Sequence, residues 1–243
     1  MTAIAARPRT VGHHYRTFRP IVRDRRPSAS GAGAFPGTNA IIAGMPTRLT
    51  HTRPTVLAVW LVIAGAVGLL AAFSLTMERL HLLADPDAVA SCDFSLLVQC
   101  TANLEAPQGS VFGFPNPIVG LVGWVAPIVV GMALLARARF ARWFWLLFAL
   151  GMTGAFVFVV WLIAQSLFAL GTLCPWCMVT WIVTIPTFYA VILHVMRAGI
   201  LPLPSPVRAG AETLMGWVPL LTVVSYAAIA LIAQLQLDWI GTL

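Results

Sequence analysis

The stretch TVLAVWLVIAGAVGLLAAFSLTM, residues 55–77, contains no charged side chain. A membrane-spanning α-helix needs about 20 consecutive apolar residues, because each residue advances the helix by about 1.5 Å and the hydrocarbon core is about 30 Å thick. The stretch therefore predicts a transmembrane helix.

Four further apolar runs of similar length follow, at residues 117–136, 143–167, 174–196 and 216–237. The whole chain is 59% hydrophobic and 9% charged, and its mean hydropathy is +0.87. Soluble domains have about half apolar and about a quarter charged residues. The links between the second, third and fourth runs are short, which favours antiparallel neighbours. We therefore predict an all-α polytopic membrane protein with five transmembrane helices, four of them in a compact bundle.

The basic residues give the expected orientation. The formal net charge is +7, and all 15 basic residues are Arg. All but Arg79 lie before residue 55, in residues 137–142 or in residues 197–208, which share one side of a five-span protein. The positive-inside rule places that side in the cytoplasm, whereas a nucleic-acid protein would carry a basic stripe. We expect a disordered basic cytoplasmic tail (1–54), a four-helix bundle (55–200) with an extracytoplasmic loop (78–116), and a linker with a fifth helix (201–243).

The four cysteines form two pairs, and the orientation places both outside, where disulfides persist. Cys174-Pro-Trp-Cys177 opens the fourth span. Pro is tolerated in the first turn of a helix, and the helix N-terminus lowers the pKa of a thiol there. The alternative is two unrelated small apolar residues. The spacing at a membrane boundary instead indicates a redox-active pair.

Cys92 and Cys100 lie eight residues apart in the outer loop. Taken alone, they suit a static disulfide that closes the loop. Together with the second pair, they suit a flexible loop dithiol that receives electrons from a soluble partner and passes them on by disulfide exchange. A Cys₄ zinc site remains a further alternative, although the spacing is unlike the usual short ligand spacing. We predict no metal.

Electrons that reach the helix-end pair need an acceptor within the membrane. The sequence lacks a haem-attachment Cys-x-x-Cys-His, a dinucleotide-binding glycine pattern and an intramembrane His pair. A lipid-soluble quinone is the remaining acceptor. Phe112, Phe114, Trp176 and Trp181 lie near the outer thiols in sequence and are the candidate residues for its pocket; interfacial or packing roles are the alternative.

The order of these motifs resembles the bacterial form of the vitamin K epoxide reductase family. The residues that carry the resemblance are Cys92 and Cys100, then Ser110-Val-Phe-Gly113 with Pro115, then Cys174-Pro-Trp-Cys177, and the similarity covers residues 55–200. The disulfide-bond formation B family carries its Cys-x-x-Cys earlier in the chain. The resemblance implies a four-helix bundle around a quinone, with Cys177 beside the quinone, Cys174 exchanging with Cys100, and Cys92 meeting a thioredoxin-fold partner.

The resemblance also implies how the protein is used. Some bacterial members carry a fused thioredoxin domain; this chain ends at Leu243, so we expect a separate extracytoplasmic DsbA-like partner. The expected function is quinone-dependent oxidation that supports disulfide formation in exported proteins, at the bacterial inner membrane. The Arg-rich, Lys-free composition favours menaquinone over ubiquinone. The alternatives are literal reduction of vitamin K or another quinone (epoxide), a DsbB-type analogue, and a non-enzymatic scaffold with static disulfides or zinc.

Overall fold

The computed structural model describes residues 54–85 and 87–237, all within one compact unit of the chain. The predicted tail lies outside the described residues except for Pro54, as does Asp238 at the predicted outer end of the chain. The described residues form helices and no β-strand, with one isolated bridge between Val98 and Leu173. Five helices are long and apolar enough to cross a membrane, which confirms the all-α, five-span prediction.

Helix α1 (Thr55–Ala84) packs closely against the second span through small residues. A Cβ atom added to Gly68 would lie 2.2 Å from Cε2 of Trp124, so only glycine admits the indole ring there. Close approach through small residues is the usual way in which helices associate in lipid. The second span is divided at Trp124 into α3 (Asn116–Gly123) and α4 (Val125–Leu135). Pro127 contributes to this break, because it has no N–H to pair with the carbonyl of Gly123.

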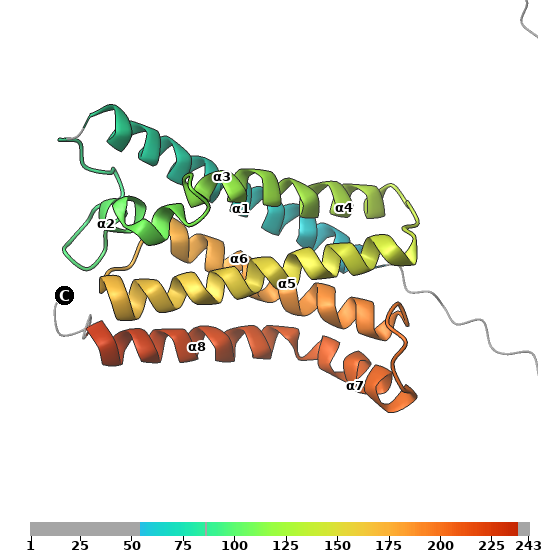
Figure 1. The fold of residues 1–243 in the computed structure, drawn as a ribbon. Helices are drawn as coiled ribbons and strands as arrows, with labels where there is room; N and C mark the ends of the chain where they lie inside the picture. The colour runs from blue at the N-terminus through green and yellow to red at the C-terminus, as the bar shows by residue number, and fades with distance from the viewer. Residues whose placement is uncertain (1–53, 86, 238–243) are drawn as a thin grey trace, which may run out of the picture. The chain divides into compact units, whose positions relative to one another are not determined.

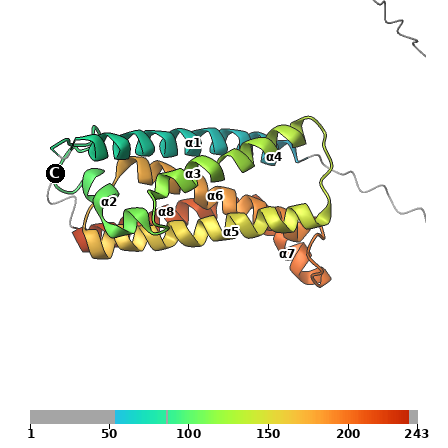
Figure 2. The same ribbon diagram turned by 45° about the horizontal axis from the view of Figure 1, so that its top comes forward.

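The third span, α5 (Arg142–Ala164), ends in a π-helical segment, η3 (Gln165–Leu170). Gly171 then takes a φ of +67°, which reverses the chain toward the fourth span. That span, α6 (Pro175–Arg197), contacts both α5 and α1, and Trp60 Nε1 of α1 donates to Thr187 Oγ1 of α6 at 3.0 Å. The four predicted spans of the bundle therefore pack together (Figures 1 and 2).

The fifth span, α8 (Val218–Leu237), packs against α6. Pro186 lies inside α6 and has no N–H, so the carbonyl of Ile182 lacks its usual helical partner. Tyr226 of α8 donates its hydroxyl to that carbonyl at 2.5 Å. Hydrogen bonds between membrane helices contribute about 0.6 kcal/mol on average and about 1.7 kcal/mol at most. Helix α8 thus supplies the hydrogen-bond donor that the carbonyl of Ile182 lacks within α6.

Two segments differ from the sequence prediction. The outer loop begins later than residue 78, because α1 continues to Ala84, and it contains the short helices α2 (Thr101–Glu105) and η2 (Pro107–Ser110). The predicted linker after residue 200 contains a helix, α7 (Ser205–Gly216). Figure 1 shows α2 at one end of the bundle and α7 at the other. The Arg residues at 137–142 and 197–208 flank the α7 end, and the cysteines lie at the α2 end.

Candidate redox site

Cys174 is the N-cap residue of α6. Its backbone is extended (φ −96°, ψ 120°), and Pro175 occupies the first helical position. The Cys174 sulfur accepts a hydrogen bond from the backbone N–H of Cys177 at 3.4 Å. Both residues carry free thiols in the structure. The two thiols of the predicted helix-end pair therefore lie on the first turn of α6, at its N-terminus.

The environment of Cys174 favours its thiolate. A hydrogen bond from the Cys177 thiol is the main cause of a lowered Cys174 pKa, and backbone N–H groups of Cys177 and Trp176 add to it. Burial and the charge of Asp93 act in the opposite direction without reversing the shift. Because the thiolate is the nucleophile in disulfide exchange, Cys174 is the more reactive sulfur of the two on chemical grounds.

The second pair, Cys92 and Cys100, is joined by a disulfide with Cα atoms 5.7 Å apart. In the structure, hydrogen bonds fasten the segment around this disulfide. Within the ring, Phe94 N–H donates to the carbonyl of Val98 at 2.9 Å. Outside it, Ser91 N–H donates to Glu78 Oε2 of α1 at 3.1 Å.

The loop is also attached to the chain that leads into α6. Gln99 N–H donates to the carbonyl of Leu173 at 3.0 Å, and Leu173 N–H donates to the carbonyl of Leu97 at 2.7 Å. Three residues after Cys100, the Asn103 amide donates to Thr172 Oγ1 at 2.8 Å. These bonds fix the position of the loop disulfide relative to Cys174.

The result is a contact between the two pairs. The sulfur of Cys174 lies 3.4 Å from the sulfur of Cys100, and both residues are completely buried. Cys92 is only 4% exposed, so a soluble partner can reach its sulfur only after a local movement of the outer segment. Of the two loop cysteines, Cys100 is the one in direct contact with the helix-end pair.

A cavity of about 870 Å³ lies within the membrane-spanning part, and Cys177 is one of its lining residues. The other helix-end cysteine, Cys174, is not. Polar lining residues come mainly from the cysteine end of the fold: Asn103, Gln108, Asn116, Gln165, Ser166, Thr180 and Thr184. The lining residues toward the opposite end are apolar: Val129, Val130, Trp143, Phe144, Leu147 and Phe148. A ligand with a polar head and a long apolar tail matches this gradient.

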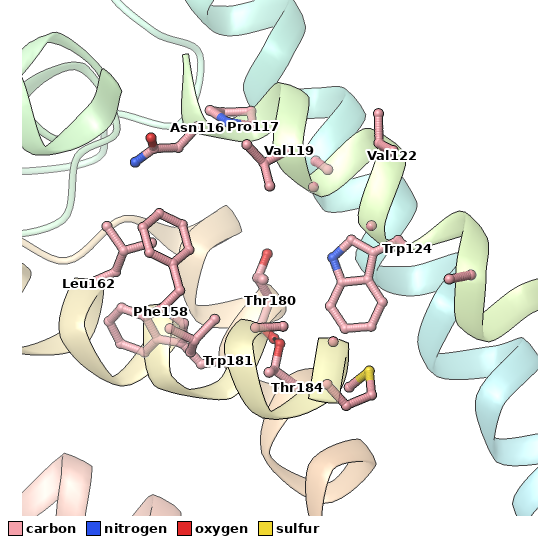
Figure 3. A pocket seen from close by; sticks show the side chains of 18 of the residues that line it. Asn116, Pro117, Val119, Val122, Trp124, Phe158, Leu162, Thr180, Trp181 and Thr184 are labelled. Atoms are coloured by element: carbon pink, nitrogen blue, oxygen red, sulfur yellow. Dashed lines mark hydrogen bonds between the residues drawn. The ribbon is translucent and has the colours of Figure 1, made fainter. Parts of the chain in front are cut away.

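Figure 3 shows the walls of the cavity. Asn116 and Trp124 lie on the α3–α4 side of the open space, and Phe158 of α5 and Thr180 of α6 lie on its other side. These residues were not among the sequence candidates. Asn116 lies at the start of an apolar run and Gln165 lies within one. Polar residues inside membrane spans often mark a functional site, so both could have been selected from the sequence on that ground.

Of the four aromatic candidates, only Trp181 lines the cavity. Phe112 lies in the outer segment, where its ring contacts Phe114 at 6.1 Å and Phe158 at 5.4 Å between centroids. Trp176 packs against the buried cluster that contains Cys92, Cys100 and Cys174. Proximity to the thiols in sequence therefore did not identify the cavity wall.

Among the residues that the structure describes, one group has the spacing of metal ligands. Ligand atoms of Cys92, Asp93 and Cys100 lie within 4.8 Å of one another. The two sulfurs are joined in a disulfide, so neither is available as a thiolate, and the Asp93 carboxylate accepts two backbone hydrogen bonds. With both sulfurs in a disulfide, the Asp93 carboxylate is the one ligand left in this group, and this does not suit a zinc ion, which takes three or four protein ligands.

The family model described as the vitamin K epoxide reductase family matches residues 59–192, a range that includes both cysteine pairs and most of each of the four spans of the bundle. A search of curated proteins found no match.

Proposed function

Because the chain belongs to the vitamin K epoxide reductase family, we propose that it is a membrane thiol–disulfide oxidoreductase that passes electrons from an extracytoplasmic dithiol protein to a quinone. The family is a family of redox enzymes, and the five apolar helices make the chain a multi-pass membrane protein. The observation that carries the proposal is the 3.4 Å contact between the sulfurs of Cys100 and Cys174, with Cys177 on the cavity wall.

The proposed electron path follows the order of the sulfurs. A partner dithiol attacks Cys92 and opens the loop disulfide, which releases Cys100. With the helix-end pair in its oxidised form, the Cys100 thiolate then attacks Cys174 of a Cys174–Cys177 disulfide across the short sulfur–sulfur contact. The Cys100–Cys174 bond forms, the Cys174–Cys177 bond breaks, and Cys177 is released as a thiolate at the cavity. Each step exchanges one disulfide for another, so the energetic cost depends on thiol pKa values and access rather than on new bond types.

The cavity supports a quinone as the acceptor. A bound quinone would accept two electrons and two protons. Polar groups such as those of Asn116 and Gln165 would hold its oxygens near Cys177, and the apolar wall would hold its side chain. Menaquinone is the quinone we favour over ubiquinone, on composition.

The location and partner are part of the proposal. The Arg-rich segments at the α7 end favour a cytoplasmic position for that end, which supports the proposal that the cysteines face the outside of a bacterial inner membrane. A separate DsbA-like, thioredoxin-fold protein is the partner we propose, and its oxidation would support disulfide formation in exported proteins. The same residues could also run net reduction of vitamin K or another quinone, because partner potentials set the direction.

The test measures quinone reduction by the purified protein with a dithiol donor. We expect Cys174→Ala and Cys177→Ala to abolish turnover, while Cys92→Ala should abolish turnover only with a protein donor. A small dithiol that reacts directly with the helix-end pair does not need the loop, so the Cys92→Ala enzyme should still reduce quinone with it. Full activity of either helix-end variant, or a wild-type protein whose four cysteines never change redox state, would instead favour a structural scaffold.

A further inference from the structure

Two hydrogen-bonded links run beside the Cys92–Cys100 disulfide. On one side, Asp93 Oδ1 accepts the backbone N–H of Cys100 at 2.5 Å and that of Thr101 at 3.1 Å. On the other side, Thr101 Oγ1 accepts the backbone N–H of Ala90 at 3.0 Å. The residues that flank Cys92 are thus attached to Cys100 and its neighbour by bonds that do not depend on the disulfide.

The start of α2 explains why these bonds form. The first N–H groups of a helix have no partner within it. Cys100 is the N-cap residue of α2, and its side chain makes no capping hydrogen bond. Asp93 supplies the missing acceptor from seven residues earlier in the chain, so its carboxylate joins two segments of the loop.

We propose that Asp93 is a positioning residue for the loop disulfide: its carboxylate keeps the Cys92 segment beside Cys100 when the sulfur–sulfur bond is open. This inference rests on the proposed function. The other bonds of the loop act elsewhere: the Val98–Leu173 bridge holds Cys100 toward α6, and Glu78 holds Ser91 toward α1. Asp93 connects the two cysteine segments by two hydrogen bonds, and the Thr101–Ala90 bond connects them by one.

The step that needs this link is closure of the loop disulfide. The Cys92 thiol loses its proton to water, and the resulting thiolate attacks the Cys100 sulfur of a Cys100–Cys174 disulfide. The Cys92–Cys100 bond forms, the Cys100–Cys174 bond breaks, and Cys174 leaves with the electron pair as a thiolate. The backbone N–H of Cys177 is already directed at that sulfur at 3.4 Å. The product has the redox state seen in the structure.

The test is the equilibrium of the loop pair with glutathione. The full-length Cys174→Ala/Cys177→Ala protein retains only Cys92 and Cys100, and its disulfide fraction is measured by alkylation and mass spectrometry. We expect Asp93→Ala to lower the equilibrium constant for disulfide formation about tenfold or more, because hydrogen bonds to a charged group have a net value above about 1.4 kcal/mol, a factor of ten. Asp93→Asn keeps an acceptor oxygen and should fall between Asp93→Ala and the parent.

Two further variants sharpen the result. Asp87→Ala removes a charge from an exposed site in the same loop and should leave the constant unchanged. Thr101→Val removes the second link and should lower the constant about fivefold, as expected for a neutral hydrogen bond. If Asp93→Ala fails to fold, Asp93→Asn provides the test of the carboxylate. The proposal is overturned if the Asp93 variants leave the constant unchanged, whatever Thr101→Val does, or if Asp87→Ala changes it as much. No quinone or partner takes part, so this outcome is separate from the fate of the proposed function.

Discussion

The contact between Cys100 and Cys174 gives the sharpest prediction. In a Cys92→Ala/Cys177→Ala variant, these two cysteines are the only ones left, with their sulfurs 3.4 Å apart. A disulfide needs about 2.05 Å between sulfurs, so an approach of about 1.4 Å is required, which side-chain rotation can supply. The backbone segments that carry Cys100 and Cys174 are already held together by the two hydrogen bonds of Leu173, at 2.7 and 3.0 Å.

The expected result is nearly complete bridging. A short flexible tether gives two groups an effective concentration of about 1 mM. The effective concentration of two sulfurs in contact on fixed segments should be higher. In a buffer with glutathione and its disulfide each at about 1 mM, the bridged form should predominate. Peptide mapping without reduction, after alkylation of free thiols, measures the bridged fraction.

The matched control is Cys92→Ala/Cys174→Ala, which leaves Cys100 with Cys177. Cys177 lines the cavity, whereas the Cys174 sulfur is the one in contact with Cys100, so this pair should stay mostly reduced. Equal bridging in the two variants, or two free thiols in the first, would refute the assignment of Cys174 as the exchanging sulfur.

Three other perturbations test the same structure. Because the Cys177 thiol is the main cause of the lowered Cys174 pKa, Cys177→Ala should move the pH midpoint of Cys174 alkylation upward, and an unchanged midpoint would contradict this cause. Gly151 lines the cavity and Gly154 does not, and a Cβ at either would meet nothing within 4 Å; Gly151→Phe should therefore raise the KM for quinone while Gly154→Phe leaves it near the parent value. Tyr226→Phe leaves a carbonyl of α6 without its partner and should lower the free energy of unfolding of the detergent-solubilised protein by about 1 kcal/mol, seen as a lower Tm. An unchanged Tm would mean that this hydrogen bond adds nothing to stability.

The helices followed from the sequence because apolar runs of membrane length leave the chain few alternatives. The helix ends did not: α1 runs on to Ala84, beyond the apolar run, because nothing in Glu78-Arg79-Leu80-His81 stops a helix. Helix α7 escaped prediction because its residues are not apolar enough to suggest a span. Its signal was local, a Pro at the first turn followed by residues such as Ala209 and Ala211 that favour helices.

At the site, the sequence placed both cysteine pairs at one end of the fold, but it could not supply the contact between Cys100 and Cys174. That contact depends on hydrogen bonds between segments more than 60 residues apart, such as Asn103 to Thr172. The attachment of the loop by Asp93 likewise arises only in the folded state. The four aromatic candidates were chosen because they lie near the cysteines in sequence, whereas the packing of the helices decides which side chains line the cavity. Of the four, only Trp181 lines it.

The bond from Tyr226 to the carbonyl of Ile182 has a consequence for assembly in the membrane. Helix α6 is synthesised before α8, so when α6 first enters the lipid its proline leaves one carbonyl group facing hydrocarbon or a trapped water. The helix that begins with the reactive cysteine turn thus acquires its full set of backbone partners only after the following span has inserted. Insertion of α8 would then act as the step that completes the maturation of the redox centre.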